Sequence, residues 1–316
     1  MDSKTYWEER ERRALRERIT DEKQYIRTLN GIYDDMLDEI TKEIDSFYQK
    51  YADKEGITLA EARKRVDQLD IKAYEDKAKR YVANKDLSPQ ANREMRLYNL
   101  TMKVNRLEML KARIGLAMVS SFDEMDKYYG DRLKSRAMEE YERQAGILGK
   151  TVIDPEKKAK VLVNASFKSA KGKYGFSDVI WTQQTVLKAE LSRLLQQGIM
   201  QGKGSQELAR EIKKTFGVSK YNAERLMRTE LARVQIGAQK QSFEENGYDE
   251  YQFITLSSAP YTKSKVCPIC ARLNGKHFKV KDMQPGENAP PMHPNCRCSV
   301  AAYMDPDEFE EWLKKQ

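Results

Sequence analysis

Apolar residues recur at intervals of three and four along the first half of the chain, and this spacing predicts long helices. The clearest run lies between Ile26 and Tyr51, where the apolar positions fall on one helical face. Ser88 and Pro89 have the form of an N-cap followed by proline at the first helical position. Apolar residues then follow at helical spacing from Leu97 to Met118, which predicts a second helix of about forty residues.

A further helix is predicted between these two, because Thr58 and Glu61 have the spacing of a capping box. Helices this long cannot each bury a wide face within one compact globule. They are expected either to form coiled-coil-like arms that contact partners, or to pack on one another as an ordinary helical bundle. Residues 1–148 are therefore expected to be an elongated helical region and a candidate for partner-binding arms.

Glycine residues divide the middle of the chain, residues 149–248, into shorter predicted helices. Ser205 is expected to cap a helix that ends at Phe216, and a second helix is expected from Asn222 to Asn246. The turn before Ser205 contains two glycines, like a phosphate-binding loop, but it lacks the Gly-x-x-x-x-Gly-Lys-Ser/Thr spacing. The glycines are therefore interpreted as a helix end followed by a helix start.

After Asn246 and Gly247 the pattern changes to alternation, which is typical of strands. Strands are predicted from Tyr251 to Leu256 and from Cys298 to Tyr303, and the Asn274-Gly275 pair predicts a hairpin turn between residues 271–273 and 276–280. A short helix is predicted to start near Asp305. The fold is therefore predicted to be mainly α with a small β-rich C-terminal module, an α+β class. Its expected domains are residues 1–148, 149–248, 249–304 and 305–316.

Composition places the chain among ordinary globular proteins. It has 316 residues, of which 40% are apolar and 34% are charged, with 16 Gly and 9 Pro, and these values exclude a fully disordered or collagen-like chain. The longest apolar run, Ile114 to Val119, has six residues, whereas a membrane helix needs about 20. The charged residues after Met1 are unlike a secretory signal. We therefore expect a reducing cytoplasmic environment and no membrane partner.

Positive charge is concentrated in the middle of the chain. The whole sequence has a formal charge of +8, and residues 150–240 contain 18 Lys or Arg against 8 Asp or Glu. Such a surplus favours a polyanionic partner such as double-stranded DNA, because binding releases condensed counterions; a lysine-rich surface that only keeps the protein soluble is the alternative. No recognition-helix pattern stands out, so we expect contact with phosphates and not with bases. The candidate residues are Lys168, Lys171, Lys173, Lys203, Lys213, Lys214 and Arg225.

All four cysteines and both histidines lie between Cys267 and Cys298. Cys267 and Cys270 form a C-x-x-C pair, and a second cluster with His293, Cys296 and Cys298 follows about 25 residues later. Zinc requires four soft or borderline donors in a tetrahedron, and two short clusters can supply them. The sequence therefore predicts a structural Zn²⁺ ion that staples the C-terminal module, with these five residues as candidate ligands.

The ligand set stays open at this point, because five donors compete for four positions. His293 with Cys296 or Cys298 would complete a set that begins with Cys267 and Cys270. Cys296 and Cys298 lie two positions apart, so on a strand both thiols would point to the same side. His277 follows the predicted hairpin turn, where a surface histidine is the commoner outcome. A module of about fifty residues has too little core to fold alone, so the ion is expected to supply its folding free energy.

Three other chemistries use cysteines in similar patterns. Structural disulfides are disfavoured in a reducing cytoplasm. A thioredoxin-like redox pair would open a helix in a βαβ unit, whereas this C-x-x-C pair lies in a Pro-rich region. A catalytic zinc ion would stand beside a general base, and neither a His-Glu-x-x-His nor a His-x-Glu pattern occurs. Structural zinc is therefore favoured.

Several ordered blocks make the chain from Phe176 to Tyr303 similar to the phage minor head protein family, also called head morphogenesis or Mu F-like. The resemblance implies a structural virion component without catalytic residues. It further implies a minor capsid protein near the portal vertex that binds the portal protein and other capsid proteins, assists head assembly and DNA packaging or delivery, and is assembled in the host cytoplasm. The blocks are Phe176–Trp181, Phe216–Tyr221, Arg228–Arg233, Cys267–Cys270, Leu273–Gly275 and Pro290–Cys298.

Two other functions would use the same features. A zinc-supported nuclease or toxin would combine a basic surface with a small metal module, although no catalytic set accompanies them. A host zinc-ribbon protein that binds nucleic acid is the other alternative. Arg228 and Glu230 lie two apart on a predicted helix and cannot face each other, so each is expected to bond to a neighbouring segment. We therefore expect that the protein is not an enzyme.

Overall fold

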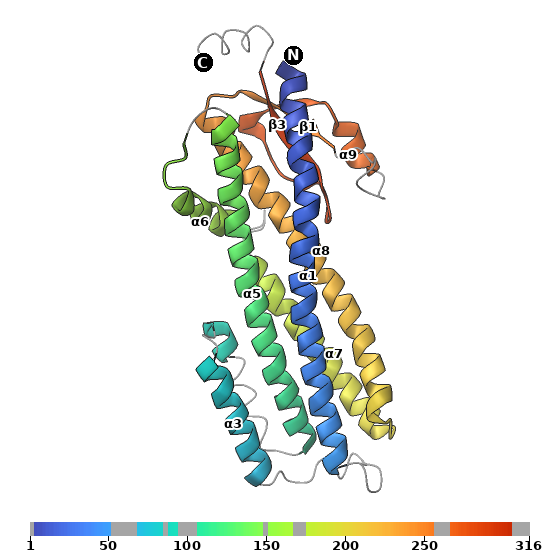
Figure 1. Ribbon diagram of the computed structural model, residues 1–316. Helices are drawn as coiled ribbons and strands as arrows, with labels where there is room; N and C mark the ends of the chain where they lie inside the picture. Colours follow the sequence, from blue (N-terminus) through green and yellow to red (C-terminus); the bar gives the residue numbers. More distant parts are fainter. Residues whose placement is uncertain are drawn as a thin grey trace. The chain divides into compact units, whose positions relative to one another are not determined.

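Most of the described chain folds into helices where apolar residues recur every three or four positions. The structure is a computed structural model that describes residues 3–51, 68–84, 88–93, 106–147, 151–166, 175–255 and 266–304. A small three-stranded sheet accompanies the helices (Figure 1), which confirms the predicted mainly α, α+β class. The helices are α1 (Ser3–Tyr51), α3 (Gln68–Asn84), α5 (Arg106–Ile147), α6 (Pro155–Ser166), α7 (Phe176–Met200), α8 (Ser205–Glu245) and α9 (Pro268–Leu273).

The first long helix and the Ser88 cap form where the sequence predicted them. α1 contains the predicted run from Ile26 to Tyr51 and begins much earlier, at Ser3. The Ser88 hydroxyl accepts a hydrogen bond from the Ala91 amide at 3.2 Å, which caps the turn that follows.

Parts of the other predicted helices lie outside the described residues. The described part of the helix predicted from Leu97 begins at Arg106 in α5, which then runs to Ile147. The capping box predicted at Thr58 and the helix predicted from Asp305 fall entirely on residues that are not described.

α8 is a single helix where the sequence predicted two. The predicted break between Phe216 and Asn222 is wrong, because helical backbone continues through Gly217. Buried positions recur every three or four residues on both sides of this glycine, so the apolar stripe is not interrupted. Burial of that stripe outweighs the ~1 kcal/mol by which glycine disfavours a helix interior. The stripe includes Leu208, Ile212, Phe216, Ala223, Met227, Leu231 and Val234.

The elements fall into two compact units, each assembled from separate stretches of the chain. Unit 1 comprises Met1–Arg27, Tyr129–Phe176 and Glu224–Gln316, and unit 2 comprises Thr28–Tyr128 and Ser177–Ala223. The expected domain boundaries after residues 148, 248 and 304 stay predictions of where the chain divides into separable parts. Among the described residues, no helix combines the length and the apolar character needed to cross a membrane.

Tyr33 joins three helices at the centre of unit 2. Its ring packs edge-on against Phe122 of α5 and Phe216 of α8, with ring centroids 6.2 and 6.3 Å away. Its buried hydroxyl lies 2.9 Å from the Ser219 hydroxyl of α8. This part of α1 is therefore packed in a helical bundle, which was one of the two arrangements expected for it.

The sheet lies in unit 1 and has the strand order β2-β1-β3, with both outer strands antiparallel to the central one. β1 spans Glu250–Ile254, β2 spans His277–Lys279 and β3 spans Ser299–Tyr303. The two strands predicted from alternation are thus confirmed with slightly different ends. β1 is buried on both faces, since Gln252 is as buried as its apolar neighbours.

The hairpin turn predicted at Asn274-Gly275 is wrong. The residues before this pair are helical, because Leu273 ends α9. Gly275 has a φ of +77°, in the left-handed region where glycine commonly ends a helix. Its amide donates to the Phe253 carbonyl at 2.8 Å, and Asn274 Oδ1 accepts from the Thr255 amide at 2.9 Å. The pair therefore ends α9 and fixes it beside β1.

The sheet shares its core with the first turns of α1 and the last turns of α8, all within unit 1 (Figure 1). Trp7 and Leu15 of α1 belong to the same buried cluster as Ile236 and Phe243 of α8 and the strand residues. The Trp7 ring also meets Tyr248 edge-on, with centroids 5.8 Å apart. The hydrophobic core beside the sheet therefore includes residues of α1 and α8 as well as residues of the strands.

Candidate metal centre

The first cysteine pair lies at the start of α9, where the local backbone sets its geometry. Cys267 is the N-cap residue and Pro268 occupies the first helical turn. The Cys267 sulfur accepts a hydrogen bond from the Cys270 amide at 3.3 Å. Burial raises the pKa of the Cys267 thiol, but the Cys270 amide and the His293 ring outweigh burial, so this pKa lies below its usual value. The turn at the start of α9 therefore favours the thiolate form of Cys267, which is the form that binds metals.

His293, Cys296 and Cys298 lie on the loop that precedes β3. The Cys296 amide donates to the His293 carbonyl at 3.1 Å, which closes a turn. Asn295 in this turn has a φ of +67°, a left-handed conformation that asparagine tolerates better than most residues. His293 Nδ1 lies 2.8 Å from the Pro294 carbonyl oxygen. Because that oxygen can only accept, Nδ1 carries a proton, and Nε2 is the atom that can coordinate a metal.

The structure brings the two cysteine clusters together. His293 Nε2 lies 3.1 Å from Cys267 Sγ and 3.6 Å from Cys270 Sγ, and Cys270 Sγ lies 3.8 Å from Cys296 Sγ. A tetrahedral zinc ion, with bonds of about 2.3 Å to sulfur and about 2.0 Å to nitrogen, places two sulfurs about 3.8 Å apart and sulfur about 3.5 Å from nitrogen. Two of the three separations have these values, and the third is shorter. The donors therefore fit a tetrahedral ion.

Cys298 is the fifth candidate donor. The ligand atoms lie within 4.8 Å of one another in each of two groups, Cys267 with Cys270 and His293, and Cys270 with Cys296 and Cys298. Cys270, which belongs to both groups, is 1% exposed and Cys296 is 2% exposed. The expectation that Cys296 and Cys298 lie on a strand is wrong, since β3 begins only at Ser299. Their thiols nevertheless reach the same group, so all five predicted donors lie together.

The proximity of the buried thiols separates their pKa values. All four cysteines are free thiols. The contact between Cys270 and Cys296 raises the pKa of Cys270 and lowers that of Cys296, because one thiol donates its hydrogen to the other sulfur. Burial lowers the pKa of His293, but the Pro294 carbonyl and the neighbouring sulfurs outweigh burial and raise it. A bound cation would replace these shared protons.

His277 lies apart from both donor groups. It is exposed on β2, and its ring lies against Tyr303 of β3 with centroids 3.8 Å apart. Its neighbour in the structure is therefore an aromatic ring on the sheet.

The predicted DNA-contacting residues differ in their surroundings. Lys203 is half-buried, and its ammonium group lies 2.5 Å from the Glu211 carboxylate, which neutralises its charge. Lys213 and Lys214 are exposed on the part of α8 in unit 2, and Arg225 is exposed on the part in unit 1. Three further candidates lie outside the described residues: Lys168, Lys171 and Lys173.

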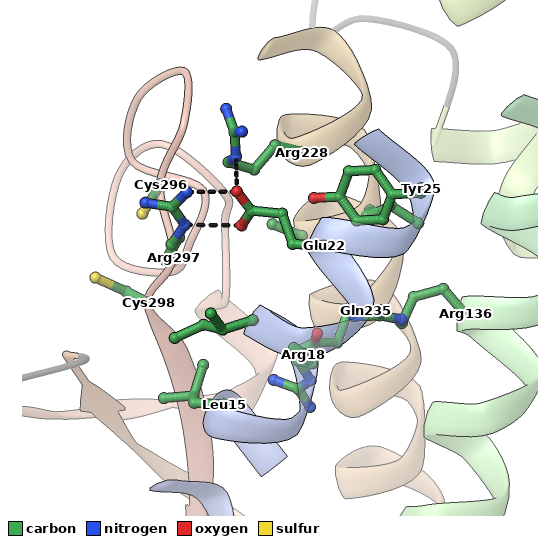
Figure 2. A pocket seen from close by; sticks show the side chains of 13 residues that line it. Leu15, Arg18, Glu22, Tyr25, Arg136, Arg228, Gln235, Cys296, Arg297 and Cys298 are labelled. Carbon is green, nitrogen blue, oxygen red and sulfur yellow. Dashed lines mark hydrogen bonds and ion pairs between the residues drawn. The ribbon is translucent and has the colours of Figure 1, made fainter. Parts of the chain in front are cut away.

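A glutamate and two arginines hold the loop that carries the second cluster, and sequence reasoning assigned none of them to the site. Arg297 donates to Glu22 of α1 through Nε at 2.8 Å and Nη2 at 2.5 Å. Arg228 of α8 donates to the same carboxylate at 2.8 Å and also to Asn295 Oδ1. Figure 2 shows the Glu22 carboxylate between the two guanidinium groups. Burial raises the pKa of Glu22, but the two arginines outweigh burial, so the net pKa is lowered.

The sequence indicated one of these contacts in part, through Arg228 in the Arg228–Arg233 block. Arg228 was expected to bond to a neighbouring segment, and it does so at two places. Glu230 instead pairs with Arg233 on the same helix at 3.2 Å. Glu22 had no signal of its own, because it lies 206 positions from Arg228 and is one of many charged residues on α1.

The comparisons with known proteins concern the stretch that contains α8, β1, β2 and the donor cluster. Residues 189–301 match the model of the family described as Phage Mu protein F like protein. This Mu F-like match covers less than half of the chain, and it confirms the resemblance predicted from the residue blocks. No curated protein and no solved structure matches the chain significantly.

Proposed function

We propose that this chain is a phage head morphogenesis protein that serves as a structural component of the virion. The single observation that carries the proposal is the match of residues 189–301 to the Phage Mu protein F like family. The matched stretch includes both the α8 residue Arg228 and the loop residue Asn295 that it contacts, so the similarity falls on parts that are packed together. The protein is proposed to act by assembly and not by catalysis.

The metal proposed for the donor cluster is zinc. Thiolate and imidazole ligands in a tetrahedral arrangement suit Zn²⁺ better than the oxygen-seeking Mg²⁺ or Ca²⁺. Cys267, Cys270, His293 and Cys296 supply four such donors, and two of the three separations between them match those of a tetrahedral ion. When bound, the ion would join α9 to the loop before β3 and stabilise this part of unit 1.

The proposed location is the portal vertex or the capsid interior, with the portal protein and other capsid proteins as partners. The family resemblance supports this proposal. Co-sedimentation of the purified chain with portal rings tests it directly, with the coat protein alone as the control. If the portal rings sediment and the chain remains in the supernatant, a portal contact is contradicted.

Contact with viral double-stranded DNA is proposed through the exposed lysines of α8. Lys213 and Lys214 are adjacent and exposed, so both ammonium groups are available to phosphates. Replacing both with glutamine should weaken binding equally for all sequences and reduce the slope of log affinity against log salt by about 1.8. Lys203→Gln is the matched control, because Glu211 already neutralises that lysine. Equal losses in the control and the double variant would contradict the assignment.

The proposed function is tested in purified phage particles. Mass spectrometry should detect the chain in virions, and phage that lack it should form heads that fail to package or deliver DNA. Absence of the chain from purified particles would overturn the proposal. Plasmid and RNA incubated with the protein and divalent metals should stay intact, whereas cleavage that disappears in a Cys267→Ser variant would indicate the nuclease alternative.

A further inference from the structure

We infer that Glu22, Arg228 and Thr229 are positioning residues for the metal centre, and that ion binding is coupled to the packing of the first turns of α1. The inference rests on the metal site proposed above. None of the three residues is a candidate ligand. Each contacts the loop that carries three of the five donors, and all of these residues belong to unit 1.

The Thr229 hydroxyl fixes the backbone of the loop. The Asn295 amide donates to Thr229 Oγ1 at 3.2 Å, and Thr229 Oγ1 donates to the Arg225 carbonyl at 2.7 Å. The hydroxyl thus uses its donor and an acceptor site at the same time. Asn295 has a left-handed backbone and directly precedes Cys296. Its conformation sets the direction of the Cys296 thiol, so Thr229 controls the position of a candidate ligand.

Arg228 fixes the side chain of the same asparagine. Its Nη1 donates to Asn295 Oδ1, while its Nε donates to Glu22 Oε1 at 2.8 Å. The guanidinium group is therefore a bridge between the loop and α1. With Thr229, it holds the turn at both its backbone and its side chain.

Glu22 completes the connection by binding the residue between the two cysteines. Arg297 presents two N–H groups to the Glu22 carboxylate in a bidentate contact. Glu22 is 9% exposed, and a buried carboxylate is strongly destabilising once a cationic partner is removed. The carboxylate therefore keeps both Arg228 and Arg297 in place only while α1 is packed against the loop (Figure 2).

This arrangement makes ion binding and α1 packing mutually dependent. An ion that orders the loop also orders Arg297 at its contact with Glu22. By thermodynamic linkage, α1 packing strengthens ion binding by the same factor by which ion binding strengthens α1 packing. Removal of a group that orients a metal ligand through a hydrogen bond typically reduces metal affinity 10–100-fold.

The first test uses the two closest substitutions of Thr229 in the full-length chain. Thr229→Val removes the hydroxyl and keeps the shape, whereas Thr229→Ser keeps the hydroxyl. Zn²⁺ affinity, measured by competition with a chromophoric chelator, should fall about 10–100-fold in Thr229→Val and stay near the wild-type value in Thr229→Ser. The absorption bands of bound Co²⁺ should also change in Thr229→Val, which a mere loss of stability would not cause. Wild-type affinity and an unchanged Co²⁺ spectrum would overturn the inference.

The second test addresses the coupling to α1. Glu22→Gln should weaken Zn²⁺ binding and increase tryptic cleavage at the arginines in the first turns of α1. Glu17→Gln, which changes an exposed glutamate on the same helix, should leave both unchanged and is the matched control. Wild-type Zn²⁺ affinity in Glu22→Gln would overturn the coupling, and this variant decides the matter if Thr229→Val does not fold. Failure of the proposed site itself looks different, because the wild-type chain would then bind neither Zn²⁺ nor Co²⁺.

Discussion

The Ser299 hydroxyl donates a hydrogen bond to Glu11 at 2.6 Å, although 288 positions separate the two residues. Both side chains are buried in unit 1. The Glu11 carboxylate also binds Arg143 at 2.6 Å and Arg18 at 3.1 Å, and the Gln239 amide nitrogen lies 3.3 Å away. One buried carboxylate therefore connects α1, α5, α8 and β3.

Removal of this carboxylate should destabilise unit 1 strongly. Glu11→Ala leaves Arg18 and Arg143 to share the buried Glu140 carboxylate, so one positive charge loses its counter-charge. We expect the free energy of unfolding to fall by about 3–5 kcal/mol. Ser299→Ala removes the hydrogen bond to Glu11 together with the weaker bonds that the hydroxyl accepts from Gln235 at 3.1 Å and Arg18 at 3.4 Å. Loss of the bond to the charged carboxylate should cost about 1.5–3 kcal/mol. Urea unfolding at neutral pH measures both. Glu17→Ala, at an exposed position of α1, is the control, and a Ser299→Ala cost no greater than that of this control would show that the bond contributes little.

Two glycines of unit 2 should respond to alanine with opposite signs. A Cβ at Gly198 of α7 would lie 2.9 Å from Leu208 Cδ1, and Leu208 is fully buried, so overpacking should cost about 1–3 kcal/mol. A Cβ at Gly217 of α8 would meet nothing within 4 Å, so Gly217→Ala should stabilise the helix by about 0.5–1 kcal/mol. Thermal unfolding should show a lower Tm for the first variant and a higher Tm for the second. A raised Tm in both would mean that Leu208 can move aside.

Acid should weaken unit 1 partly through Glu140. Burial raises the pKa of this carboxyl, but Arg143 at 2.5 Å and Arg18 at 2.9 Å outweigh burial and lower the pKa to about 2. Because the pKa is lower than its ordinary value of 4.5, the stabilisation is complete above about pH 4.5 and is lost as pH falls towards 2.

Glu140→Gln removes this titration. The difference in unfolding free energy between wild type and variant should therefore shrink by up to about 3 kcal/mol as pH falls from about 5 to about 2. Urea unfolding at several pH values measures this difference. A difference that stays constant across that range would contradict the assignment to Glu140.

The two candidate fourth ligands should differ in their effect on metal binding. Cys296 is buried and lies 3.8 Å from Cys270, the separation of two thiolates on one ion, whereas Cys298 is only half-buried. Cys296→Ser should therefore reduce Zn²⁺ affinity more than Cys298→Ser does. Chelator competition measures the order, and His277→Ala, at an exposed site on β2, should leave the affinity unchanged. The reverse order of the two serine variants would assign the fourth position to Cys298.

The sequence predicted most elements because local physics decides them. The periodic apolar residues of α1 and the Ser88 cap act over one or two helical turns, and both predictions are confirmed. The errors occurred where a local signal has two meanings. Gly217 can end a helix or lie inside one, and Asn274-Gly275 can make a hairpin or end a helix. In both cases, packing far along the sequence decided the outcome.

The candidate site likewise contains some residues that the sequence could indicate and others that it could not. The sequence identified the five candidate donors, which the structure brings close together, because few residue types bind transition metals and all four cysteines and both histidines lie in one short window. Glu22 was not predictable, since its two arginines reach it only after α1, α8 and the loop have packed together. Lys203 shows the opposite case, because its local charge suggested DNA contact while the fold pairs it with Glu211.

The packing of Trp7 against the sheet also has a consequence for biosynthesis. The first turns of α1 leave the ribosome long before β3, which contributes to the same buried cluster, has been made. At about 5–20 residues per second, the interval is on the order of tens of seconds. Throughout that time the indole ring and its apolar neighbours lack their final partners. Nascent chains that stop short of Ser299 should therefore remain attached to chaperones, and unit 1 should close only after β3 has left the ribosome.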